Sequence, residues 1–158
     1  MTWKIHALSA APFRPLFDLD DGALARRGVR RMAADAPHSA PCRISLVDAQ
    51  PGETLLLVNH VHLPSPASPY RANGPIFVRQ GAARAALAPG SVPDMLARRL
   101  LSARVYDGAA MMIDADVEDG ACIGARLDSW FTNPDVHRIQ LHTARRGCFM
   151  AEALRVSG

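Results

Sequence analysis

Several common signatures are missing from this sequence of 158 residues. Lys4 is its only lysine, and aromatic residues make up only 6%. No apolar run approaches the roughly 18 residues that cross a bilayer, and the N-terminus lacks the basic start and sustained apolar segment of a signal peptide. The three cysteines include no Cys-x-x-Cys pair. We therefore expect a cytoplasmic protein with reduced thiols and no association with membranes.

Motifs for phosphate, cofactor and metal binding are also missing. The chain contains no Gly-x-Gly-x-x-Gly, Gly-x-x-x-x-Gly-Lys or His-Glu-x-x-His sequence, so neither a cofactor nor a metal is predicted. Most of the basic charge is arginine, in four Arg-Arg pairs that include Arg98-Arg99 and Arg145-Arg146. Nucleic-acid binding is not expected, because stacking aromatics are scarce and acidic residues lie among the arginines. A guanidinium group does suit carboxylate and phosphate, so a small anionic ligand is consistent with this composition.

The composition that remains is that of an ordinary globular protein, with 49% apolar and 21% charged residues. A chain of this length forms one domain by default, covering residues 1–158. Strands are expected at 3–8, 29–34, 42–47, 53–63, 76–80, 103–107 and 111–118. Helices are expected at 20–27, 93–101 and about 120–131. This order predicts an α+β fold, with a mainly antiparallel sheet, a few short helices and a C-terminal β-hairpin.

Local patterns assign faces to several of these elements. Asp20 and Asp21 are favourable N-caps for the first helix, and Gly28 is well placed to end it. The helix at 93–101 is expected to bury Leu96 and Leu100. In the alternating strand at 111–118, the face predicted to point into the core carries Met111, Ile113, Ala115 and Val117.

Two strands joined by a tight loop are predicted for the C-terminal stretch 136–156 (VHRIQLHTARRGCFMAEALRV). With a five-residue loop, His142 pairs with Cys148 and Arg138 pairs with Glu152, an opposite-charge partnership that supports this register. The other face then holds a consistent set of core residues, namely Ile139, Leu141, Phe149, Ala151 and Ala153. A slip by one residue would exchange the two faces and is disfavoured.

The predicted pairing places an imidazole beside a thiol. A nearby histidine can activate a cysteine as a nucleophile, which makes Cys148 and His142 candidate catalytic residues. The same pair could ligate a metal together with His60 and His62, which alternation places on one face of their strand. Alternatively, the pair is a small buried cysteine next to a hydrogen-bonded histidine. The same alternative applies to Cys42, a second thiol of interest.

Other polar side chains could contact an anion or act in acid–base chemistry. Arg104 and Tyr106 share one face of a strand, and Tyr70 and Arg71 offer the same combination of cation and phenol from a loop. On the strand at 111–118, one face carries three carboxylates that are either an acid–base cluster or a solvated outer face, namely Asp114, Asp116 and Glu118.

Four segments together resemble one protein family. They are Pro41-Cys-Arg-Ile-Ser-Leu46, the segment 70–77 ending Gly-Pro-Ile-Phe, Arg104-x-Tyr106-Asp107, and His142-x-x-x-x-Gly147-Cys148-Phe149. This combination resembles the bacterial family known as domain of unknown function 1203, from about residue 20 to the end. The resemblance implies a small single-domain bacterial protein and no established activity. The family pattern commonly has an asparagine after the histidine, where this chain has Thr143.

Three functions from different classes follow from these features. The first is binding of a small anionic ligand in a cleft beside the hairpin, formed by His142, Cys148, Arg104, Tyr106, Tyr70, Arg71, His60 and Cys42. The second is an enzyme in which Cys148 is the nucleophile and His142 the base. The third is self-association as a homodimer, which an exposed apolar patch near Met150 and Leu154 would favour.

Overall fold

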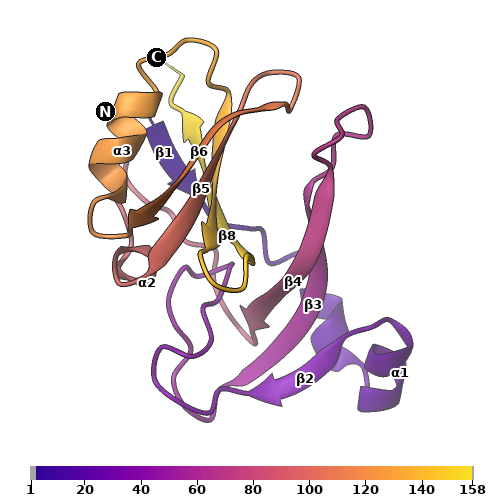
Figure 1. Cartoon of the computed structure of the whole chain (residues 1–158). Coiled ribbons are helices and arrows are strands. Elements are labelled where there is room, and N and C mark those ends of the chain that lie inside the picture. The colour runs from indigo at the N-terminus through magenta and orange to yellow at the C-terminus, as the bar shows by residue number, and fades with distance from the viewer. Residues whose placement is uncertain (1–2, 158) are drawn as a thin grey trace.

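The structure is a computed structural model that describes residues 3–157. Within these residues, eight strands form two antiparallel sheets (Figure 1). The five-stranded sheet has the order β1 (Trp3–His6), β8 (Phe149–Arg155), β7 (Arg138–Thr143), β5 (Leu100–Tyr106) and β6 (Met112–Asp119). The three-stranded sheet has the order β2 (Arg30–Ala33), β3 (Thr54–Leu63) and β4 (Ala72–Arg79). The predicted α+β fold with a C-terminal hairpin is confirmed.

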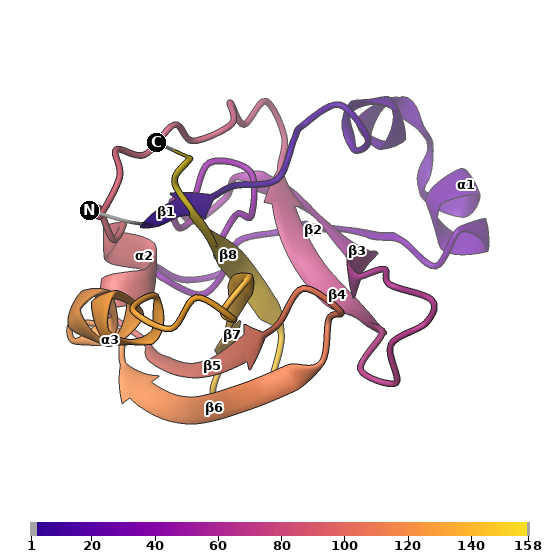
Figure 2. The same cartoon turned by 90° about the horizontal axis from the view of Figure 1, so that it is seen from above.

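The helices are short, and they are α1 (Asp21–Arg26), α2 (Asp94–Ala97), α3 (Ile123–Trp130) and the 3-10 helix η1 (Arg14–Asp18). Figure 2 shows α2 and α3 on the side of the five-stranded sheet that faces away from the three-stranded sheet. The predicted caps of α1 are confirmed, because Asp20 accepts a hydrogen bond from Ala23 N–H at 2.7 Å and Gly28 has a φ of 70°. No helix within residues 3–157 is both long and apolar enough to cross a membrane.

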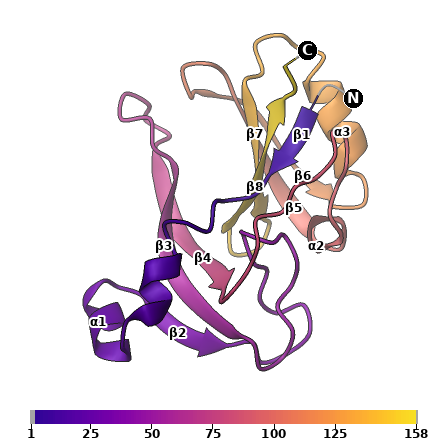
Figure 3. The same cartoon turned by 180° about the vertical axis from the view of Figure 1, so that it is seen from behind.

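Two main hydrophobic cores follow from this arrangement. One lies between the five-stranded sheet and its helices and includes Leu96, Leu127 and Leu141. The other joins α1, β3 and β4 to the hairpin and includes Leu24, Leu56, Val78 and Phe149. The segment between β2 and β3 runs past the tip of the β7–β8 hairpin (Figure 3), where Arg43 donates a hydrogen bond to Phe149 O. The two sheets are thus connected through the hairpin.

The strand expected at 42–47 is not formed. Isolated bridges pair Cys42 with Phe77 and Pro41 with Asp48, and Leu46 has a φ of 53° within a turn. Ile44 and Leu46 alternate with Arg43 and Ser45 as in a half-buried strand, but Arg43 is only 2% exposed and Val47 is 58% exposed. The burial of this segment therefore does not follow the alternation.

The predicted helix at 93–101 is also too long. The helix α2 ends at Ala97, and Leu100 begins β5 with 53% of its surface exposed. Leu96 is buried as expected, and Met95 is buried beside it. The apolar pattern therefore belonged to two elements, because a turn at Arg98 separates the helix from the strand.

The strand expected at 111–118 corresponds to β6, but the face expected to be buried is exposed. Ile113 and Val117 are 44% and 56% exposed. The acidic face is exposed as well, although Asp114 accepts a hydrogen bond from Trp130 Nε1 at 2.7 Å and Asp116 pairs with Arg126 at 2.9 Å. The alternation does not mark a core face here, because β6 lies at the edge of its sheet with both faces exposed from Ile113 to Val117.

The free edge of β6 is protected by its own carboxylates. Gly120 N–H donates to Arg99 O, so the alternation of an antiparallel pair directs every second N–H of β6 away from β5. These outward groups are the N–H groups of Ala115, Val117 and Asp119. Each donates to the carboxylate of the preceding residue, at 2.8, 2.8 and 3.1 Å. No partner strand is needed to satisfy them.

The register predicted for the C-terminal hairpin is wrong, by two residues from Arg138 to Leu141 and by one residue at His142. Gln140 pairs with Glu152, and His142 pairs with Phe149 instead of Cys148. A β-bulge between Leu141 and His142 leaves Met150 as an extra residue, so that Met150 joins the core and Phe149 moves to the opposite face. The ion pair between Arg138 and Glu152 is confirmed with an Nη1–Oε2 distance of 3.4 Å, although the register partner of Arg138 is Leu154.

Candidate functional site

The site residues expected from the sequence separate into two groups in the structure. The first group surrounds Gln140 on the face of the five-stranded sheet that meets β3, and contains His62, His142 and Phe149. The second lines a cavity beside the hairpin turn and contains Cys148. His142 and Cys148, which were expected to face each other, thus belong to different environments.

Gln140 is at the centre of the first group. It is fully buried, and its Nε2 donates to His62 O at 2.7 Å. Its Oε1 lies 2.9 Å from His62 Nδ1 and 3.3 Å from His142 Nε2. The second nitrogen of His142, Nδ1, lies 2.9 Å from Gly147 O, which can only accept a hydrogen bond. The proton of a neutral His142 is therefore on Nδ1.

His142 is neutral at ordinary pH. Burial, and after it the charge of Arg104, lowers the pKa of His142. The hydrogen bond to Gly147 O opposes the shift, and the net pKa is about 3. With the proton on Nδ1, a lone pair on Nε2 faces Gln140 Oε1, which already accepts from His62. This imidazole connects the hairpin turn to the interior and does not point at Cys148.

His60 and His62 share one face of β3, as the sequence predicts. The His62 ring stacks on Phe149 with centroids 5.6 Å apart, and the His60 ring lies 5.5 Å from the same phenyl group. Burial is the main cause that lowers the pKa of both histidines. Within residues 3–157, no group of three or more histidine, cysteine or acidic side chains is arranged to hold a metal ion. The contacts made by these histidines are those of packed aromatic rings.

Arg104 and Tyr106 are brought near Tyr70, as the alternation on β5 implies. Tyr106 is 2% exposed, and its ring lies edge-on to Tyr70 with centroids 6.4 Å apart. Burial raises the pKa of Tyr106, and the charge of Arg104 opposes that shift. Arg104 also reaches the hairpin turn, since a Cβ on Gly147 would lie 3.6 Å from its Nη2. The Nη1 of Arg71 lies 3.4 Å from Ser68 O, within its own loop.

Cys42 is fully buried, and its sulfur accepts a hydrogen bond from Arg79 N–H at 3.3 Å. Cys122 is exposed at the start of α3, and Cys148 is half-buried. The three thiols therefore occupy three different environments, of which only that of Cys148 opens on the cavity beside the hairpin.

The smaller of two prominent cavities has a volume of about 560 Å³ and lies between the hairpin turn, the segment 38–43 and the three-stranded sheet. We call it the hairpin cavity. Its polar wall is rich in cations and includes Arg43, Arg99, Arg146, Thr143 and Cys148. Its other wall is apolar and includes Met32, Leu57, Pro75 and Phe77.

Arg43 is the most unusual residue of the hairpin cavity. Its guanidinium donates to two backbone carbonyls, Phe149 O at 2.7 Å and Pro41 O at 2.6 Å. Among residues 3–157, no carboxylate lies within ion-pair distance of it. Burial lowers the pKa of Arg43 to about 10, and Cys148 is the largest of the influences that oppose this shift, which also include Asp48. The side chain is thus a buried cation whose charge is not neutralised.

The other two arginines of the hairpin cavity differ in their partners. Arg99 is paired with Asp48, with Nη–Oδ distances of 2.6 and 3.0 Å, and it also donates to His38 O. Arg146 is exposed on the hairpin turn and has no ion-pair partner among the described residues. Two of the three cations therefore face the cavity without a carboxylate of the protein.

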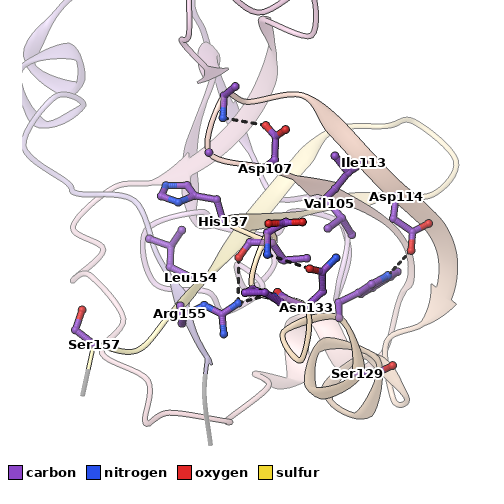
Figure 4. Close-up of a pocket in the computed structure, with 16 residues that line it drawn as sticks. Val105, Asp107, Ile113, Asp114, Ser129, Asn133, His137, Leu154, Arg155 and Ser157 are labelled. Carbon is purple, nitrogen blue, oxygen red and sulfur yellow. Dashed lines mark hydrogen bonds between the residues drawn. The ribbon is translucent and has the colours of Figure 1, made fainter.

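The larger cavity, about 1050 Å³, lies at the other end of the five-stranded sheet (Figure 4). Three of its charged side chains are held by hydrogen bonds within the protein, whereas Asp135 is exposed. Asp114 accepts from Trp130, Asp107 accepts from the N–H groups of Ala109 and Met111, and Arg155 donates to three backbone carbonyls. None of the residues proposed for the anion site or as the catalytic pair lines this cavity, although Asp114 of the acidic cluster does.

The sequence reasoning missed the importance of Arg43, Arg99 and Arg146. Two of them belong to the Arg-Arg pairs. The sequence indicated that arginine suits anions, but it did not assign these arginines to a site. Arg43 stands in the Pro-Cys-Arg segment of the family pattern, directly after Cys42. Its local signal was hidden, because alternation predicted that this side chain would face solvent.

These features define a small α+β protein with a basic, thiol-bearing cavity beside its C-terminal hairpin. The chain belongs to the family described as protein of unknown function (DUF1203), whose model matches residues 39–155. The match includes both Arg43 and Cys148, and it begins later than the expected residue 20. No curated protein and no solved structure matches the chain.

Proposed function

We propose that the protein binds a small anionic molecule in the hairpin cavity. The observation that carries this proposal is Arg43, a buried guanidinium with no carboxylate partner on the wall of a cavity. A pKa of about 10 leaves it charged at neutral pH. A buried charge is costly unless it is paired, so an anion in the cavity would relieve that cost and gain charge-assisted hydrogen bonds.

The supporting residues are arranged around this anchor. Arg146 adds a second unpaired cation from the hairpin turn, and Thr143 and Cys148 add polar atoms from the same wall. In this proposal Arg104 acts from the other side of Gly147, where it holds the turn in place, and Tyr106 packs with Tyr70. The roles expected for Arg71, His60 and Cys42 as ligand contacts stay predictions.

Thermal unfolding of the full chain with phosphate, sulfate and succinate, at matched ionic strength, tests the proposal. A ligand at about 100 times its Kd adds about 2.7 kcal/mol, which for a chain of this size raises the Tm by roughly 5–10 °C. Succinamide is the neutral control, and Arg146→Gln is expected to reduce the shift. A Tm that responds to none of these anions contradicts the proposal.

Catalysis by Cys148 is a second candidate function. Cys148 opens on the hairpin cavity, which Arg43 also lines, and a cysteine at such a site can act as a nucleophile. His142, proposed as the base, donates to Gly147 O through Nδ1 instead. Cys148 is expected to react with iodoacetamide at pH 7 faster than the more exposed Cys122. If Cys122 reacts faster, the nucleophile loses its main support.

The homodimer stays a prediction. Met150, where an exposed apolar patch was sought, is fully buried, and the mixed face of the hairpin packs against His62 of β3. Exposed apolar side chains lie instead on β6, at Ile113 and Val117. Light scattering of the purified chain measures the oligomeric state directly.

A further inference from the structure

We infer that the ligand of the hairpin cavity is amphipathic, with one anionic head group and an aliphatic or aromatic body. This inference rests on the proposed function and names the class of ligand. It follows from the two walls of the cavity, which differ in chemistry and belong to different elements of the fold.

The apolar wall is one face of the three-stranded sheet. Leu57 of β3 and Phe77 of β4 are register partners, so their side chains lie side by side on the same face. Arg30 is the β2 partner of Leu57, which places Met32, two residues further on, on this face as well. Leu57 and Phe77 are only half-buried, and Met32 is 42% exposed. Apolar surface thus remains uncovered inside the cavity.

The cationic wall comes from the hairpin turn and the segment before β3. Arg43 and Arg146 lie there without carboxylate partners, beside Thr143 and Cys148. A compact anion such as phosphate would contact this wall and leave the apolar wall exposed to water. A volume of about 560 Å³ is within the usual range for organic ligands. A ligand that satisfies both walls therefore needs a charged end and a hydrocarbon end.

Titration calorimetry of the full chain with acetate, butanoate, hexanoate and octanoate, below their micelle concentrations, tests this inference. Each methylene group that is buried on the apolar wall should raise the affinity about fourfold, until the cavity is filled. Hexanamide, which has the same body without the charge, should bind far more weakly than hexanoate. Inorganic phosphate measures the contribution of the cationic wall alone.

Two substitutions on exposed residues separate the walls. Met32→Gln should flatten the dependence on chain length and leave phosphate and acetate binding unchanged. Arg146→Gln should weaken all the carboxylates by a similar factor and leave the gain per methylene unchanged. Octanoate should also slow the alkylation of Cys148 by iodoacetamide while Cys122 reacts at the same rate, which localises the ligand.

The outcomes distinguish this inference from the proposed function. If phosphate and acetate bind as tightly as octanoate, the amphipathic ligand is ruled out and the anion site stands. If no anion binds, or if hexanamide equals hexanoate, the proposed function fails as well. If octanoate binds but does not protect Cys148, its site is elsewhere and the inference is overturned.

Discussion

The hairpin cavity and the larger cavity differ more in how their charges are paired than in their size. In the larger cavity, Asp107, Asp114 and Arg155 are each held by hydrogen bonds within the protein. In the hairpin cavity, Arg99 is paired with Asp48, but Arg43 and Arg146 have no carboxylate. The cavity of about 560 Å³ therefore has more to gain from a ligand than the one of about 1050 Å³.

Under the proposed function, unneutralised charge and not volume marks the binding site. A cavity whose charged groups are already paired gains no relief of buried charge from a ligand. A buried guanidinium without a counterion lowers the stability of the empty protein, and a ligand that neutralises it recovers that free energy. The comparison is testable, because single substitutions change the pairing in one cavity and leave the other intact.

The largest effect is expected from Asp48→Asn, which removes the partner of Arg99. Both side chains are largely buried, with exposures of 7% and 16%. Loss of one member of a buried pair should lower the free energy of unfolding by about 3 kcal/mol. The freed Arg99 should at the same time strengthen anion binding in the hairpin cavity.

Urea denaturation and calorimetry measure these two effects. The matched control is Asp94→Asn, which removes the exposed partner of Arg98 and should cost less than about 0.5 kcal/mol. Equal losses in the two variants would show that the Asp48–Arg99 pair has no special role.

Arg43→Met should have the next largest effect. It removes hydrogen bonds to Phe149 O and Pro41 O, each worth about 1.5–3 kcal/mol for a charged donor. Relief of the buried charge offsets part of this, so a net loss of about 2–3 kcal/mol is expected, together with the loss of anion binding. Arg43→Lys keeps the charge and should recover part of the binding. Anion-induced stabilisation that survives in Arg43→Met would remove the basis of the comparison.

Acid should lower the free energy of unfolding through His142, which donates to Gly147 O in the hairpin turn. The pKa of about 3 in the folded state is below the ordinary value of 6.5, so the unfolded chain binds an extra proton between these values. Stability must then fall as the pH falls below about 6.5, by about 2 kcal/mol at about pH 5 from this group alone. His62 has its pKa lowered too and adds to the loss, while Arg104 and Arg43 keep their charge.

His142→Asn tests the origin of this acid sensitivity in urea titrations at about pH 7 and pH 5. The asparagine amide can donate to Gly147 O as Nδ1 does, but it does not titrate. The variant should lose most of the difference in stability between the two pH values. An unchanged difference would assign the effect to other groups.

The smallest effect is expected in the larger cavity. Arg155→Ala removes hydrogen bonds to the carbonyls of Phe131, Asn133 and Val136 at an exposed position. A loss of about 1 kcal/mol is expected, with no change in the affinity of the hairpin cavity for anions. A decrease in anion binding would indicate that the anion binds in the larger cavity, which would contradict the proposed site.

Features that depend on neighbouring residues could be predicted from the sequence, and features that depend on distant contacts could not. Asp20 and Gly28 delimit α1 as their local chemistry implies. The alternation of β6 is also present in the strand, but the face predicted to be buried is exposed, because burial depends on elements that are distant in the sequence. In the hairpin, the ion pair of Arg138 with Glu152 was recognised, whereas the observed register pairs His142 with Phe149 instead of Cys148.

The site shows the same limit. Arginine chemistry indicated an anion, but of the residues expected to form the cleft only Cys148 lines the hairpin cavity. The importance of Arg43 depends on burial by a segment that folds against Phe149, more than a hundred positions later in the chain. No local sequence pattern predicts this contact, because Arg43 and Phe149 belong to segments that are far apart in the sequence.

The carboxylates of β6 have a consequence for how copies of this chain behave at high concentration. An open strand edge usually templates the addition of another strand, which leads to aggregation. Here Asp114, Asp116 and Glu118 occupy the outward N–H groups at the positions that such a strand would need. The acidic pattern that resembled acid–base chemistry thus satisfies the backbone of its own strand, and an added strand would find no free N–H donor at these three positions.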